Sequence, residues 1–133
     1  MGQNEKLRVA LDMTEEWDKA TDGASGLTMG CVVVRTEFAQ QNKEALDLFL
    51  DEYERSVQTV TSAEGLEHAA QLAEQYNIVK APVALKAIPE CNIVFVQGEQ
   101  MKQIAGGFLE VMYQANPKSV GGKLPDANFY YNR

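Results

Sequence analysis

The feature that most constrains the fold is a short run of apolar residues without alternation, residues 31–35 (CVVVR). Valine is β-branched and favours strands, and a strand that is apolar on both faces belongs inside a sheet that is covered on each side. Gly30 bounds the run on its N-terminal side. We therefore expect an α/β fold in which residues 31–35 form a central strand.

Two further segments have strand-like patterns. Residues 7–13 (LRVALDM) alternate apolar and polar side chains with a period of two, which predicts a short strand. Residues 92–96 (NIVFV) are apolar and few, so the pattern fits either a strand or an extended segment.

Helical periodicity dominates the middle of the chain. Over residues 42–61, apolar side chains recur at steps of three and four, which predicts a helix with one apolar stripe. The stripe consists of Leu46, Phe49, Leu50, Tyr53, Val57 and Val60. Just before it, Thr36 is expected to cap a short turn of helix. Further helices are expected over residues 63–76, 82–88 and 99–115, the first capped by the preceding Ser62.

The region before the valines predicts a short helix and a loop. Thr14 is the expected cap, and Glu15 and Glu16 suit the positive end of the helix dipole. Trp17 lies in the first turn, where it is either a packing anchor or an aromatic wall of a ligand cleft. Residues 21–30 are a loop by their content of Gly, Ser, Thr and Asp.

The end of the chain is a polar tail that carries three consecutive aromatic residues, Phe129, Tyr130 and Tyr131. Aromatic residues near a terminus indicate that the tail is held against another surface. Gly106 and Gly107 lie inside the last predicted helix and weaken it. They indicate either the close approach of another backbone or local flexibility.

Charge narrows the classes of partner. The chain of 133 residues has 12 basic and 19 acidic side chains, a net charge of −7. This acidity disfavours nucleic acids and anionic membrane surfaces. No apolar run approaches the ~20 residues that span a bilayer, and no signal peptide is visible at the start. The beginning would suit a piece cut from a longer protein.

Motifs for catalysis and metal binding are sparse. Cys31 and Cys91 have no partners at metal-ligand spacing, and we expect both to be small buried side chains, with their pairing left open. The sequence around Gly121 lacks the spacing of a phosphate-binding loop. His68, the single histidine, is expected on a solvated helix face. We therefore predict no enzyme, no metal and no cofactor.

Four stretches nevertheless resemble one protein family. They are ALDMTEEWDKATDG, MGCVVVRTEFAQQNKEALDLFLDEYERSV, AIPECNIVFVQGEQMK and NPKSVGGKLPDANFYY. Together they are similar to the C-terminal part of the substrate-binding proteins of bacterial ABC importers, of the nitrate/sulfonate/taurine and thiamine-precursor type. The resemblance extends over about residues 6–131.

The resemblance implies a partial type II periplasmic-binding-protein fold, with few strands covered by C-terminal helices. Residues 1–29 would be the end of the second lobe and the crossing segment, and residues 30–133 the C-terminal part of the first lobe, within one structural unit. The implied ligand contacts are Trp17, Thr28, Met29 and Gly30. The implied partners are a small solute and, for full-length relatives, an ABC permease, in an extracytoplasmic location.

Two other functions remain open. The chain would be a stand-alone interaction module that self-associates, by strand pairing or by swapping the segment before Gly30, because a strand that is apolar on both faces needs neighbours. An enzyme derived from the same fold is the third alternative. It would require a segment rich in Cys and His, and none is visible in the sequence.

Overall fold

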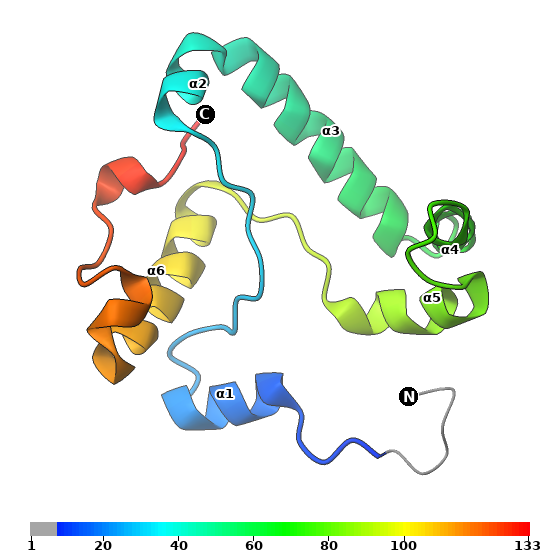
Figure 1. Cartoon of the computed structure of the whole chain (residues 1–133), viewed down its shortest axis with the longest axis horizontal. Coiled ribbons are helices and arrows are strands. Elements are labelled where there is room, and N and C mark those ends of the chain that lie inside the picture. The colour runs from blue at the N-terminus through cyan, green and yellow to red at the C-terminus, as the bar shows by residue number, and fades with distance from the viewer. Residues whose placement is uncertain (1–7) are drawn as a thin grey trace. The chain divides into compact units, whose positions relative to one another are not determined.

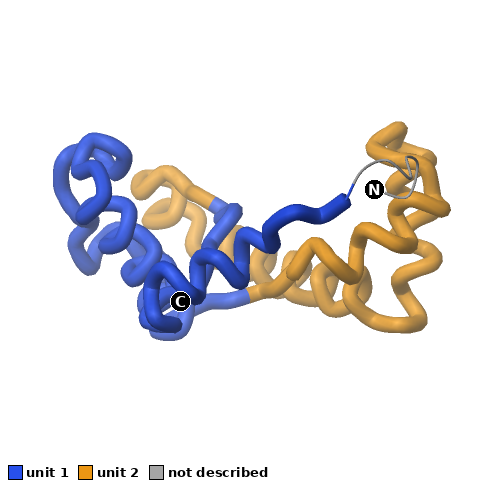
Figure 2. Tube along the Cα trace, turned by 90° about the horizontal axis from the view of Figure 1, so that it is seen from below, with its two compact units in different colours: residues 1, 3–32, 96–133 blue, residues 2, 33–95 orange. Residues whose placement is uncertain are grey.

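The computed structural model describes residues 8–133, which divide into two units. In this described part, the first unit comprises residues 8–32 and 96–133, and the second comprises residues 33–95 (Figure 2). The chain leaves the first unit after Val32 and re-enters it at Val96. Both passages fall within segments whose sequence favours strands.

The described part of the first unit contains two α-helices and two short 3-10 helices. They are α1 (Met13–Thr21), α6 (Gly98–Ala115), η2 (Pro117–Val120) and η3 (Ala127–Phe129) (Figure 1). Helix α6 ends at the predicted place, because Asn116 precedes Pro117 and adopts an extended backbone.

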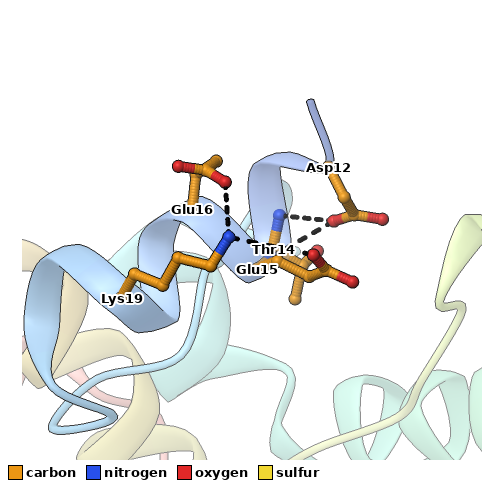
Figure 3. Close-up of polar contacts among 5 residues, drawn as sticks. All are labelled: Asp12, Thr14, Glu15, Glu16 and Lys19. Atoms are coloured by element: carbon orange, nitrogen blue, oxygen red, sulfur yellow. Dashed lines mark hydrogen bonds and ion pairs between the residues drawn. The ribbon is translucent and has the colours of Figure 1, made fainter. Parts of the chain in front are cut away.

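Helix α1 begins with a side-chain cap from Asp12 (Figure 3). Asp12 Oδ1 accepts hydrogen bonds from the backbone N–H groups of Thr14 at 2.8 Å and Glu15 at 3.2 Å. One turn later, Lys19 Nζ lies 2.7 Å from Glu16 Oε1. The prediction that Thr14 is the cap is therefore wrong by two residues. Asp12 takes this role because its backbone is extended and its carboxylate reaches two amides of the first turn.

The second unit is built from four α-helices and one 3-10 helix. They are α2 (Thr36–Gln41), α3 (Lys43–Thr61), α4 (Leu66–Gln75), α5 (Ala81–Ala87) and η1 (Ile88–Cys91). Helix α4 packs against α5 and lies at the end of α3 (Figure 1). The predicted stripe of α3 contributes two buried residues to the core, and α4 and α5 contribute one alanine each. The four are Leu46, Val57, Ala70 and Ala84.

The turn between α3 and α4 depends on Ser62 and Gly65. Ser62 Oγ accepts a hydrogen bond from the Gly65 N–H at 2.9 Å, so Ser62 caps the turn that leads into α4. A Cβ on Gly65 would lie 2.0 Å from the carbonyl oxygen of Thr59. Only glycine fits there, because that carbonyl oxygen occupies the place of a side chain.

The predicted α/β class, and with it the partial type II periplasmic-binding-protein fold, is wrong. Residues 8–133 are helical and contain no strand. Residues 8–12, 31–35 and 92–96 have no ladder of backbone hydrogen bonds. Their β-propensity has no effect without a neighbouring strand, because a strand is stabilised by its cross-strand pairs. Leu7, the first residue of the predicted N-terminal strand, lies outside the described residues.

The expectation that the cysteines are buried is also wrong. Cys31 and Cys91 are free and exposed. Cys31 belongs to one of the unpaired segments and Cys91 ends η1, so neither lies in a packed layer. The assignment of residues 1–29 and 30–133 to parts of two lobes stays a prediction.

Candidate functional site

Trp17 joins three parts of the first unit. Its indole stacks on the ring of Phe108 in α6, with ring centroids 5.1 Å apart and planes inclined by 27°. Its Nε1 donates a 2.8 Å hydrogen bond to the carbonyl oxygen of Ser25, in the loop after α1. Both the ring and the polar edge of Trp17 are therefore used in packing, as expected for an anchor.

The paired glycines of α6 let two segments approach the helix closely. A Cβ on Gly107 would lie 3.2 Å from Ser25 Oγ, and a Cβ on Gly106 would lie 3.6 Å from the Tyr130 hydroxyl. The loop after α1 and the C-terminal tail thus contact neighbouring positions of one helix. Of the two explanations that the sequence left open for these glycines, this geometry favours close approach.

The other three predicted ligand contacts lie in the loop that follows Ser25. Thr28 is half-buried, and its Oγ1 is buried without a hydrogen-bond partner among the described residues. Met29 and Gly30 are exposed. The hydrogen bond and ring contact of Trp17 involve none of these three residues. Within the described residues, no hydrogen bond or ring contact therefore brings the predicted contacts together.

The aromatic tail is held against α6. Arg133 Nε donates a 2.7 Å hydrogen bond to Oε1 of Gln97, the residue before α6. Tyr130 lies over Gly106, and its ring meets Phe129 edge to face with centroids 5.2 Å apart. Phe129 itself remains exposed. The expectation that the tail is held against another surface is therefore confirmed for Tyr130, and the surface belongs to the same unit.

A small open cavity lies between the tail and the first turn of α6. Its volume is about 220 Å³, and its lining includes Glu99, Lys102, Tyr130 and Tyr131. Pockets for drug-sized ligands usually start near 300 Å³. Glu99 and Lys102 lie 3.5 Å apart as an exposed ion pair, so the two charges at this cavity offset each other. The cavity therefore lacks the size and the concentrated charge of a specific ligand site.

A second feature is an exposed apolar strip on α3, made of Leu48, Phe49 and Tyr53. Their exposed fractions are 60%, 48% and 37%. The rings of Phe49 and Tyr53 are nearly parallel with centroids 6.0 Å apart, and Tyr53 meets Phe95 edge to face at 5.6 Å. The sequence placed Phe49 and Tyr53 in the apolar stripe of this helix without predicting their exposure, so the α3 strip was missed. Leu48, an apolar residue outside the predicted stripe, was the sequence signal that could have indicated an exposed apolar surface on this helix.

A third feature is residues 31–35, which we call the valine segment. The backbone groups of residues 31–34 make no hydrogen bond within the described part of the chain. Val33 is 80% exposed, and Val32 and Cys31 are exposed as well. Unpaired backbone that carries β-branched side chains is a template for strand pairing.

Glu74 closes the connection between α4 and α5. Its Oε2 accepts a 2.9 Å hydrogen bond from the Ala81 N–H, and its Oε1 lies 2.9 Å from Lys80 Nζ. The hydrogen bond from Ala81, with the nearby Lys80 ammonium, lowers the pKa of Glu74 below its ordinary value of 4.5. Glu74 lies near the end of α4, and its carboxylate reaches the first residue of α5. The carboxylate therefore caps the N-terminus of α5.

Residues 8–133 contain no candidate metal site and no candidate membrane-spanning helix. No group of three or more His, Cys, Asp or Glu side chains in that range could hold a metal ion. No helix in the same range is long and apolar enough to cross a membrane.

Comparison of the chain with protein-family models, with curated proteins and with solved structures found no match. The resemblance to substrate-binding proteins therefore stays a prediction from sequence.

Proposed function

We propose that the chain is an interaction module that self-associates through its valine segment. The observation that carries this proposal is the unpaired backbone of residues 31–34, next to side chains that favour strands. A second copy supplies a segment with the same unpaired groups. Pairing the two satisfies backbone donors and acceptors on both copies and covers the exposed valines.

The sequence of the segment fits antiparallel pairing about a two-fold axis at Val33. In that register, Arg35 of one copy lies opposite Cys31 of the other, so the two arginines do not face each other. The valines then form cross-strand pairs, which are the main stabilising contacts of a two-stranded ladder. The expected assembly is a symmetric dimer.

The small core of the second unit supports the need for such a contact. Among residues 33–95, the buried apolar side chains are Leu46, Val57, Ala70 and Ala84, and two of the four are alanine. Units below ~70–80 residues rarely gain enough stability from a single core, and association is one of the usual remedies.

The test is the mass of the purified chain in solution, measured by light scattering at micromolar concentrations. We expect a dimer. Val33→Pro removes a backbone donor and should give a monomer, whereas Val33→Ile keeps the strand preference and should stay dimeric. Because Val33 is 80% exposed and its N–H has no partner among the described residues, neither change should unfold the chain. A monomeric wild-type chain would overturn the proposal.

Solute binding is a second candidate function, favoured by one observation. The hydroxyl of Thr28, one of the ligand contacts implied by the resemblance, is buried without a partner among the described residues. A bound solute or water would satisfy it. In this hypothesis the chain is a solute-binding component, or part of one, that works with an ABC permease in an extracytoplasmic location.

A thermal-shift screen of small anions, sulfonates, amines and pyrimidines tests solute binding. A ligand at a hundred times its Kd should stabilise the fold by about 2.7 kcal/mol. Thr28→Val removes the hydroxyl at constant shape and should abolish that shift. Without a ligand, the same variant should be more stable by about 1 kcal/mol, because no buried hydroxyl is left unpaired. A screen with no shift contradicts solute binding and leaves the self-association proposal intact.

A further inference from the structure

We propose that the α3 strip is a docking surface for a basic amphipathic helix of another protein. The strip consists of exposed apolar side chains on the longest helix of the second unit, with Leu48 one position along the chain from the Phe49–Tyr53 pair. Leu48 and Phe49 are 60% and 48% exposed, and Tyr53 supports Phe49 by stacking at 6.0 Å. A partner that covers these side chains would remove apolar area from water around an aromatic anchor, which is how binding hot spots are built.

The charges around the strip select a basic partner. Leu48 lies between Glu44 and Glu52, which are four residues before and four residues after it and so share its side of the helix. Glu52 is already in an exposed ion pair with Arg55. Helix α3 as a whole has five acidic and two basic side chains. Lysine or arginine residues beside the apolar face of a partner would therefore meet a complementary field.

The same charges argue against a second copy at this surface. A second α3 would bring the same excess of acidic side chains against the first, in a chain whose net charge is −7. The α3 strip and the valine segment therefore call for different partners. The docking surface does not depend on self-association, because the two sets of residues share no member.

The geometry of α3 favours a helical partner over an extended one. Its 19 residues span about 28 Å, which matches a partner helix of similar length. Phe49 and Tyr53 are four residues apart and form one ridge, and the ridges of a second helix pack into the grooves beside such a row. An amphipathic partner helix would contact this surface through leucine-like residues spaced three and four positions apart.

The test uses the full chain and a fluorescently labelled synthetic peptide of about 18 residues, helical, with leucine on one face and lysine beside it. Binding is followed by fluorescence anisotropy at low and high salt. We expect saturable binding that weakens with salt, and no binding of a control peptide in which every lysine is replaced by glutamate. Equal binding of both peptides would overturn the charge argument, and no binding of the lysine peptide would overturn the docking surface.

Variants locate the site. Leu48→Ala and Glu52→Lys should each weaken binding of the lysine peptide by about tenfold, since one removes an apolar contact and the other reverses a flanking charge. Both side chains are mostly exposed, so the fold should persist, as circular dichroism can verify. The matched control is Ile78→Ala, which truncates a 77% exposed aliphatic residue elsewhere in the same unit and should leave binding unchanged.

Two outcomes would contradict the proposal even if the peptide binds. If Leu48→Ala binds as tightly as the wild type, the interaction is general attraction of a cation to an acidic chain. If Leu48→Ala instead converts a dimer to a monomer in light scattering, a second copy covers the strip. Val33→Pro, which tests self-association, should leave peptide binding unchanged, so the failure of one proposal is distinguishable from the failure of the other.

Discussion

The indole of Trp17 stacks on Phe108 with ring centroids 5.1 Å apart, which joins α1 to α6 across ninety residues of sequence. The second unit lies within that interval. The first unit is thus assembled from two distant pieces of chain, and the Trp17 contact is one of those that join them.

Two substitutions of Trp17 should distinguish the stability contributed by its ring contact from the stability contributed by its hydrogen bond. Trp17→Phe keeps an aromatic ring and loses the hydrogen bond to Ser25, so we expect a loss of about 1 kcal/mol in the free energy of unfolding. Trp17→Ala also loses the stack, and we expect about 2–3 kcal/mol, less than for a fully buried tryptophan. Urea unfolding followed by circular dichroism measures both. Equal losses would show that the ring contact contributes little.

The two glycines of α6 should respond differently to alanine. Gly106→Ala should stabilise the chain by up to about 1 kcal/mol, because alanine favours helix and its Cβ would meet Tyr130 at an ordinary 3.6 Å. Gly107→Ala places a Cβ 3.2 Å from Ser25 Oγ, and the crowding should cancel that gain. Thermal melts of the two variants give the comparison. A Gly107 variant that is the more stable of the pair would contradict this geometry.

Gly65 should be the glycine least tolerant of substitution. Gly65→Ala drives a Cβ against the Thr59 carbonyl, where it would lie at 2.0 Å, so the turn between α3 and α4 must open. We expect a loss of about 1–3 kcal/mol, the usual range for overpacking. Gly30→Ala is the control, because nothing lies within 4 Å of the Cβ it would add. Chemical unfolding curves that coincide for the two variants would refute the close contact.

Glu74 should make the second unit sensitive to acid. Its pKa is lowered in the folded chain, so its carboxylate stabilises the fold above about pH 4.5, and this contribution is lost as the pH falls through the lowered pKa. Glu74→Gln should therefore be less stable than the wild type at about pH 7, and the difference should be smaller at about pH 3, because the carboxylate becomes protonated as the pH falls through its lowered pKa. Urea midpoints at the two pH values test this.

A control for that experiment is Glu64→Gln, an exposed position before α4. The midpoint difference between this variant and the wild type should be small at both pH values, as for most surface substitutions. A Glu74→Gln difference that grows on acidification would have the wrong sign and would remove the capping role.

Helices were predictable because their signals are local. The steps of three and four in residues 42–61 predicted α3, and the Asn116-Pro117 pair predicted the end of α6. Caps were less certain, because adjacent polar residues compete. Thr14 was the predicted cap of α1, but the extended backbone of Asp12 gives the role to that residue.

Strands were not predictable because a strand is not a local structure. The valines of residues 31–35 favour extended backbone, but a sheet needs a neighbour that the described chain does not supply. Whether a candidate surface is exposed likewise depends on segments that are distant in sequence. A packing anchor was one of the two roles that the sequence left open for Trp17, whereas the exposure of Phe49 depends on what covers α3.

By itself, the sequence determined the helical segments, the glycine positions and the acidic balance, because propensity and charge belong to residues and their near neighbours. Only the tertiary structure decided that Gly107 admits the Ser25 loop, that Tyr130 lies on α6, and that the valine segment and the α3 strip remain uncovered. Those outcomes depend on contacts between segments far apart in the chain, and no local pattern specifies which segments meet.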